Sequence, residues 1–126
     1  MTMNRPRILV VDDEPPLREL VMVTLGDAFV CDEAGDGDTA LARLEESRYD
    51  LVMLDVMMPG TSGTDVLRHM REDDELRDVP VVVMSAWQSP QDVASALEAG
   101  ADRFLAKPFR IDELGSMVRA LVGRSG

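Results

Sequence analysis

The sequence predicts an α/β fold, in which five parallel strands form one doubly wound sheet with helices packed on both of its faces. Short apolar runs alternate with segments of helical periodicity, which is the pattern of βαβ units rather than of an antiparallel meander. Several of the runs are continuously apolar, as expected of strands that are covered on both faces. The length of 126 residues suits one domain, which we expect to span residues 1–126 with five helices and the strand order 2-1-3-4-5.

The first βα unit begins with a continuously apolar run at residues 8–11, which predicts a strand near the centre of the sheet. Pro15 and Pro16 suit the first turn of the helix that follows, because N–H groups there have no partner within the helix. Gly26 is expected to end this helix. Its inward face is a stripe of four apolar side chains, Leu17, Leu20, Val21 and Leu25.

A weaker strand at residues 29–33 leads into a turn at 34–38, whose two glycines permit positive φ angles, and a helix is expected over residues 38–47. The third strand is predicted at residues 51–54. A loop at 57–63 then precedes a helix whose inward side chains are Val66, Leu67 and Met70.

The fourth unit follows an acidic stretch at residues 72–78, which is most simply a solvated connection. Residues 80–84 form another continuously apolar strand. Ser89 and Pro90 indicate the start of the fourth helix, and Gly100 lies near its end. Its expected inward side chains are Val93, Ala94 and Leu97.

The fifth unit has a short strand at residues 103–106, followed by Lys107 and Pro108. The last helix has the clearest periodicity in the chain, and we expect Gly123 to end it. The apolar stripe of this helix consists of Leu114, Met117, Val118, Leu121 and Val122.

Charge and hydropathy exclude several classes of function. The formal net charge is −11, so phosphate backbones and anionic lipid surfaces would be repelled, and direct nucleic-acid binding is not expected. The apolar runs stop at four or five residues, well short of the roughly 20 that cross a bilayer. Residues 1–7 are polar and lack the apolar core of a signal peptide. We therefore expect a cytoplasmic protein that makes no membrane contact.

Charged side chains stand at the ends of three predicted strands. Asp12 and Asp13 close the first run, Asp55 closes the third, and Lys107 follows the fifth. The predicted strand order makes the first and third strands neighbours, so these groups should share the crevice where open α/β sheets bind ligands. Two like charges about 4 Å apart repel by about 4 kcal/mol at an effective dielectric constant of about 20, so the cluster needs a counter-ion. Its oxygen ligands favour Mg²⁺.

Each of these residues also has a simpler interpretation. Asp13 could cap a helix, Asp12 could be its solvated neighbour, and Asp55 could be a turn residue at a strand end. Their joint placement at strand ends, together with Ser85 and Lys107, favours a site. A carboxylate in such a site can attack phosphorus and form an aspartyl phosphate, and Asp55 is the central candidate.

Several separated motifs resemble one family, the receiver domain of two-component response regulators, which has a flavodoxin-like or CheY-like fold. The resemblance covers about residues 6–122. Its motifs, in the order and spacing of that family, are Val10-Val11-Asp12-Asp13-Glu14, Asp55 with Met58-Pro59-Gly60 and Gly63, Met84-Ser85-Ala86, Gly100-Ala101-Asp102, and Lys107-Pro108-Phe109.

The resemblance implies a chemistry. A phosphoryl group would pass from a phosphohistidine of a sensor histidine kinase, or from a phosphotransfer protein, to Asp55. Mg²⁺ would be held by Asp13, by Asp55 and by the backbone carbonyl of Met57, with Asp12 acting mainly through a metal-bound water. Lys107 would pair with the phosphoryl group. The protein would then be a signalling module rather than an enzyme, because its only reactions are phosphorylation and dephosphorylation of its own Asp55.

The resemblance also implies a switch. The Ser85 hydroxyl would swing toward a phosphoryl oxygen, and the Phe104 ring would fill the space that Ser85 vacates. The alternative for Phe104 is plain core packing. The Lys107–Pro108 peptide bond is expected to be cis, as in the family.

Two apolar side chains are individual to this chain, Met57 and Trp87. We interpret them as flanking the phosphoryl site, where their bulk would hinder attacking water and lengthen the life of the acyl phosphate. For Trp87 the alternative is contact with a partner protein, because exposed aromatic residues anchor interfaces.

Rival functions fit the sequence less well. In Mg²⁺-dependent phosphatases with an aspartate nucleophile, one residue separates the two aspartates, whereas Asp12 and Asp13 are adjacent. A flavin module would need a glycine- and hydroxyl-rich phosphate loop after the first strand. A receiver-like domain that is never phosphorylated usually lacks one of the acidic or lysine positions.

The output is less determined by the sequence. The signal is expected to leave through the fourth helix, fifth strand and fifth helix, by docking of a downstream protein or by homodimer formation. The segment from Lys107 to Leu114 also resembles receivers that precede DNA-binding domains in longer proteins. A stand-alone regulator and an excised module both fit.

Overall fold

A single parallel sheet forms the centre of the structure. The computed structural model describes residues 5–56 and 62–125, and for residues 123–125 the backbone alone. The strands lie in the order β2-β1-β3-β4-β5, and all neighbouring pairs are parallel, which confirms the predicted topology. Their bounds are β1 (Arg7–Val11), β2 (Val30–Ala34), β3 (Leu51–Asp55), β4 (Val81–Ser85) and β5 (Arg103–Ala106).

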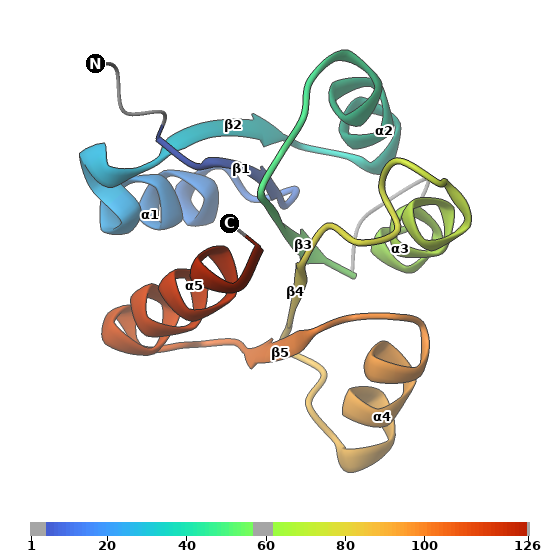
Figure 1. Cartoon of the computed structure of the whole chain (residues 1–126). Coiled ribbons are helices and arrows are strands. Elements are labelled where there is room, and N and C mark those ends of the chain that lie inside the picture. Colours follow the sequence, from blue (N-terminus) through green and yellow to red (C-terminus); the bar gives the residue numbers. More distant parts are fainter. Residues whose placement is uncertain (1–4, 57–61, 126) are drawn as a thin grey trace.

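Helices cover both faces of this sheet, with α1 and α5 on one side and α2, α3 and α4 on the other (Figure 1). In the described part of the chain, no helix combines the length and the apolar character that crossing a bilayer requires. The bounds are α1 (Pro15–Leu25), α2 (Gly37–Glu46), α3 (Gly63–Glu72), α4 (Pro90–Glu98) and α5 (Ile111–Ser125), with a short 3₁₀ turn at Gly26–Ala28.

The sheet separates two apolar clusters, one under each layer of helices. On one side Val21 of α1 and Leu114 of α5 pack against Ile8 and Val10. On the other side Leu44, Leu67 and their neighbours from α2 and α3 pack against alternate residues of the same strands. Every residue of β3 and β4 is buried, so their continuous apolar character follows from burial on both faces.

Three helices differ from the predictions. In α1, Leu20 is 41% exposed although it was assigned to the inward stripe, and only Val21 and Leu25 are fully buried. The helix α5 continues to Ser125, so Gly123 does not end it; glycine weakens a helix by about 1 kcal/mol relative to alanine, but it stops the helix only where the chain turns left-handed. Gly26 does turn, with φ of 63°, and it ends α1 as predicted.

The inward face of α4 is also different from the predicted one. Ala94 and Leu97 are exposed, and no residue of α4 is fully buried. The small side chains of Ala96 and Ala99 face the core instead. The prediction was wrong because it gave the largest apolar side chain the inward position, whereas this helix approaches the sheet through alanines.

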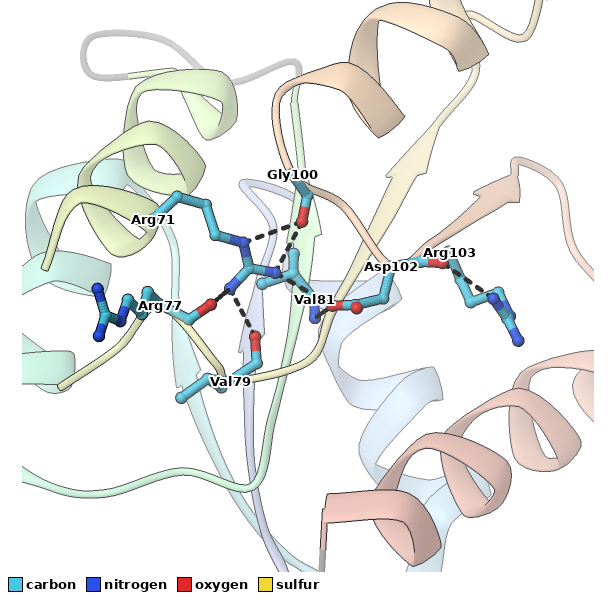
Figure 2. A network of polar contacts seen from close by, with 7 residues as sticks. All are labelled: Arg71, Arg77, Val79, Val81, Gly100, Asp102 and Arg103. Atoms are coloured by element: carbon cyan, nitrogen blue, oxygen red, sulfur yellow. Dashed lines mark hydrogen bonds and ion pairs between the residues drawn. The ribbon is translucent and has the colours of Figure 1, made fainter. Parts of the chain in front are cut away.

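An arginine holds together the end of the sheet that lies away from the acidic residues (Figure 2). The Arg71 guanidinium donates to the carbonyl oxygen of Gly100 at 2.7 and 2.9 Å, and to those of Arg77 at 2.9 Å and Val79 at 2.8 Å. It also pairs with the Asp102 carboxylate at 3.1 Å, which accepts a further hydrogen bond from the backbone N–H of Val81. The end of α3, the connection before β4 and the connection before β5 are therefore fixed to one another by one side chain.

Candidate functional site

Three carboxylates meet at the carboxyl ends of β1 and β3, as the strand order predicts. One oxygen from each of Asp12, Asp13 and Asp55 lies within 4.8 Å of the others. Asp12 and Asp55 are buried, with 0% and 3% of their surface exposed, whereas Asp13 faces solvent. These carboxylates belong to a crevice that opens outward from the sheet.

Lys107, which follows β5, bridges the two buried carboxylates. Its Nζ lies 2.7 Å from Asp12 Oδ2 and 3.3 Å from Asp55 Oδ2, and the exposed Glu14 carboxylate lies 3.7 Å away. Burial by itself would lower the pKa of the ammonium, but the hydrogen bond and charge of Asp12, together with those of Asp55, outweigh it and raise the pKa of Lys107. Lys107 is therefore a permanent cation in this crevice.

Ser85 occupies the carboxyl end of β4 and is buried. Its Oγ accepts a hydrogen bond from the backbone N–H of Trp87 at 2.9 Å, and its carbonyl oxygen accepts one from the N–H of Lys107. The Trp87 side chain is 58% exposed and lines a cavity of 260 Å³ that also contains Asp13, Asp55 and Lys107. An apolar wall therefore stands beside the carboxylates.

Phe104 lies on β5, half-buried against the cluster formed with α2 and α3. Its ring and Ser85 line the same cavity of 190 Å³, which lies between α3 and α4. Space for a change of ring position therefore exists next to Ser85.

The simpler interpretations of Asp12 and Asp13 do not fit the structure. Glu14 is the N-cap residue of α1 and makes no side-chain cap, so Asp13 does not cap that helix. Asp12 is fully buried rather than solvated. The Lys107–Pro108 bond is cis, as expected.

One polar group behind the crevice has no counterpart in the sequence predictions. The Arg18 guanidinium donates to the backbone carbonyl of Asp12 at 2.6 Å and pairs with Glu33 at 2.6 Å. Its sequence neighbours mark it only as a polar position on an amphipathic helix, because the carbonyl that it binds belongs to a different element.

The donor set fits a hard divalent cation. Three carboxylates and the one ammonium of Lys107 sum to a formal charge of −2, and oxygen ligands with solvent access suit Mg²⁺. Among the residues that the structure describes, none pairs with the Asp13 carboxylate, which leaves it available as a ligand. The expected carbonyl ligand, that of Met57, lies outside the described residues.

Curated relatives resemble nearly the whole chain. The DNA-binding response regulator MtrA of Mycolicibacterium smegmatis is 44% identical over 126 residues, which cover 99% of this chain and 54% of that protein. The phosphate regulon transcriptional regulatory protein PhoB of Escherichia coli K12 is 41% identical over 119 residues, which cover 94% of this chain and 52% of PhoB. The chain spans about half the length of these relatives.

These relatives correct one prediction. The net charge of −11 led us to expect no direct contact with nucleic acid, yet MtrA is named a DNA-binding regulator. The charge argument was wrong in scope, because it covers only these 126 residues and the relatives are about twice as long. Repulsion at the surface of one acidic domain does not decide what a whole protein binds.

Solved structures and a family profile agree on what the chain is. The receiver domain of Francisella response regulator 1452 matches with a TM-score of 0.91 and 31% identity, over 97% of this chain and all of that one. The profile of the response regulator receiver domain matches residues 8–119. This chain therefore belongs to the response regulator receiver domain family of two-component signalling.

Proposed function

We propose that the domain accepts a phosphoryl group on Asp55 from the phosphohistidine of a sensor histidine kinase or a phosphotransfer protein. One observation carries the proposal: the buried Asp55 carboxylate lies 3.3 Å from Lys107 Nζ, within a crevice that reaches solvent. An Asp55 oxygen would attack phosphorus and form an acyl phosphate. The P–N bond to the donor imidazole would break, and the imidazole would leave with the electron pair and take up a proton.

The charges of the crevice support this step. The Lys107 ammonium already bridges Asp12 and Asp55. It would therefore pair with the phosphoryl oxygens as negative charge develops at Asp55. Ser85 would donate its hydroxyl hydrogen to a phosphoryl oxygen. A Mg²⁺ held by Asp13, Asp55 and the carbonyl of Met57, with Asp12 contributing mainly through water, would supply charge neutralisation when bound.

The change at the phosphorylation site would reach the protein surface through a rearrangement of side-chain packing. Once Ser85 moves, the Phe104 ring would enter the 190 Å³ cavity beside it and change the surface around α4, β5 and α5. Phosphorylation would thus switch a protein-interaction surface, and the domain would act in the cytoplasm as a regulator. The relatives named above support DNA as a partner of the regulator in which this domain would act.

The proposal is tested by incubating the protein with acetyl phosphate and MgCl₂ and measuring its mass. We expect the addition of one phosphoryl group that is stable in acid and labile in base, as an acyl phosphate is. Asp55→Asn should abolish it. Asp74→Asn, which changes a carboxylate that is 90% exposed in the connection after α3, is the matched control and should leave it intact. An adduct that persists in Asp55→Asn would remove Asp55 as acceptor, and no adduct on the unsubstituted protein would favour an interaction domain that is never phosphorylated.

A second prediction concerns the lifetime of the phosphoryl group. Trp87→Ala is expected to speed dephosphorylation several-fold, because the indole borders the cavity through which water would reach Asp55. Met57→Ala should act in the same direction. The measurement is the decay of the acyl phosphate after removal of the donor, with Trp87→Phe as the control that keeps an aromatic wall. An unchanged decay rate would instead support contact of Trp87 with a partner protein.

A further inference from the structure

Arg18 ties three elements together directly behind the acidic crevice. It lies on α1, and its side chain is only 15% exposed. From there it reaches the carbonyl oxygen of Asp12 at the end of β1 and the carboxylate of Glu33 on β2, both at 2.6 Å. A Cβ at Gly35 would lie 3.3 Å from Arg18 Nη1, so the absence of a side chain at that position leaves room for the guanidinium.

The carbonyl that Arg18 holds belongs to a residue whose other polar groups are also fixed. The N–H of Asp12 donates to the carbonyl of Ala34 at 3.0 Å. Asp12 Oδ1 accepts from the backbone N–H of Glu14 at 2.9 Å, and Oδ2 accepts from Lys107 at 2.7 Å. Arg18 thus supplies the last of four attachments, and it is the one that acts on the peptide unit between Asp12 and Asp13.

That peptide unit decides where Asp13 points. The peptide group is planar, so a fixed Asp12 carbonyl also fixes the N–H of Asp13 and the start of its backbone. The Asp13 carboxylate faces solvent, and none of the described residues holds it. Its place beside Asp12 and Asp55 therefore depends on its backbone, whose orientation the Arg18 hydrogen bond stabilises.

We propose that Arg18 is a positioning residue for divalent-cation binding, which acts by orienting the Asp12–Asp13 peptide so that the three carboxylates converge. This inference rests on the proposed Mg²⁺ dependence of the domain. Arg18 does not contact the cation. It is held in turn by Glu33, so the geometry of the site depends on a pair of side chains that lie outside it.

The direction in which Mg²⁺ affinity changes when Arg18 is substituted distinguishes a positioning role from a purely electrostatic one. Arg18 is a cation close to a site for cations, so its charge alone opposes Mg²⁺ binding, and its removal would tighten binding. Loss of positioning has the opposite effect, because substitution of groups that orient metal ligands weakens affinity, typically by about 10-fold or more.

The experiment is isothermal titration of the whole chain with MgCl₂, below the unfolding temperature of every variant as checked by circular dichroism. We expect Arg18→Gln to weaken Mg²⁺ binding about 10-fold. Arg18→Lys keeps the charge, but an ammonium cannot bind the Asp12 carbonyl and Glu33 together as the planar guanidinium does. It should therefore give a smaller loss of Mg²⁺ affinity. Arg71→Gln is the matched control: it removes another arginine that holds backbone carbonyls, at the opposite end of the sheet, and should leave Mg²⁺ affinity unchanged.

The outcomes are distinct. Equal or tighter binding by Arg18→Gln would overturn the positioning role while the proposed function stands. Equal weakening by Arg71→Gln would also overturn it, because the loss would then reflect stability alone. Failure of the unsubstituted protein to bind Mg²⁺ would overturn the proposed metal dependence and this inference with it.

Discussion

Gly63→Ala is expected to lower the free energy of unfolding by about 2 to 3 kcal/mol and to slow phosphorylation of Asp55 by about 100-fold. Gly63 is the first residue of α3 and is buried against the end of β3. A Cβ at this position would lie 2.7 Å from Val56 Cα and 2.8 Å from the carbonyl carbon of Asp55, and closer still to the oxygen of that carbonyl. These are backbone atoms, which cannot rotate away, so the acceptor residue itself would be displaced.

The measurements are urea unfolding and the rate of modification by acetyl phosphate. Gly115→Ala is the matched control, since the nearest atom to its added Cβ is the far end of the flexible Arg119 side chain at 3.0 Å. Gly115 lies within α5, where alanine favours the helix by up to about 1 kcal/mol, so this variant should be as stable as the parent or more so. A Gly63→Ala protein with parental stability and parental rate would contradict the close approach of α3 to β3.

Arg71→Ala should cost about 3 kcal/mol of stability in urea unfolding, because it leaves three backbone carbonyls without the guanidinium donor and removes the ion-pair partner of Asp102. The side chain is 20% exposed and makes five hydrogen bonds to four residues, so water can replace only part of what is lost. Arg71→Lys should be intermediate, because an ammonium cannot reach the carbonyls on both sides as the planar guanidinium does.

Arg68→Ala provides the comparison for this variant. Arg68 lies on the same helix, is 62% exposed and pairs with Asp65 three residues earlier, an exposed ion pair of the kind that contributes little. We expect its unfolding midpoint to stay close to that of the parent. Equal losses in both variants would show that helix charge, rather than the network of Figure 2, determines the effect.

The parts of the fold that could be predicted are those where the cause is local in sequence. The continuous apolar runs at residues 8–11 and 81–84 are buried on both faces of the sheet, and their apolar character predicted both strands. For the first of them it also predicted a place near the centre of the sheet, which the strand order confirms. The paired prolines after Asp13 indicated the start of α1 correctly. The convergence of Asp12, Asp13 and Asp55 followed from strand order alone, because parallel strands end at the same edge of the sheet.

The missed features depend on contacts between elements. Arg18 and Arg71 both bind backbone carbonyls that are brought to them by the fold, and a carbonyl carries no mark in the sequence. The inward face of α4 could not be deduced from hydrophobicity either, because Leu97 is more apolar than Ala96 yet lies outward. Such choices depend on how closely a helix approaches its sheet.

The thin anchoring of α4 has a consequence for how the domain moves. No residue of this helix is fully buried; its start is closed by the Ser89 capping box, and the Arg71 network lies just beyond its end. Local opening of α4 would therefore expose little new apolar surface to water and cost little free energy, while the strands stay paired. Deuterium should accordingly enter the amides of α4 well before those of α5, so that α4 can change its position more readily than the helix packed on the opposite face of the sheet.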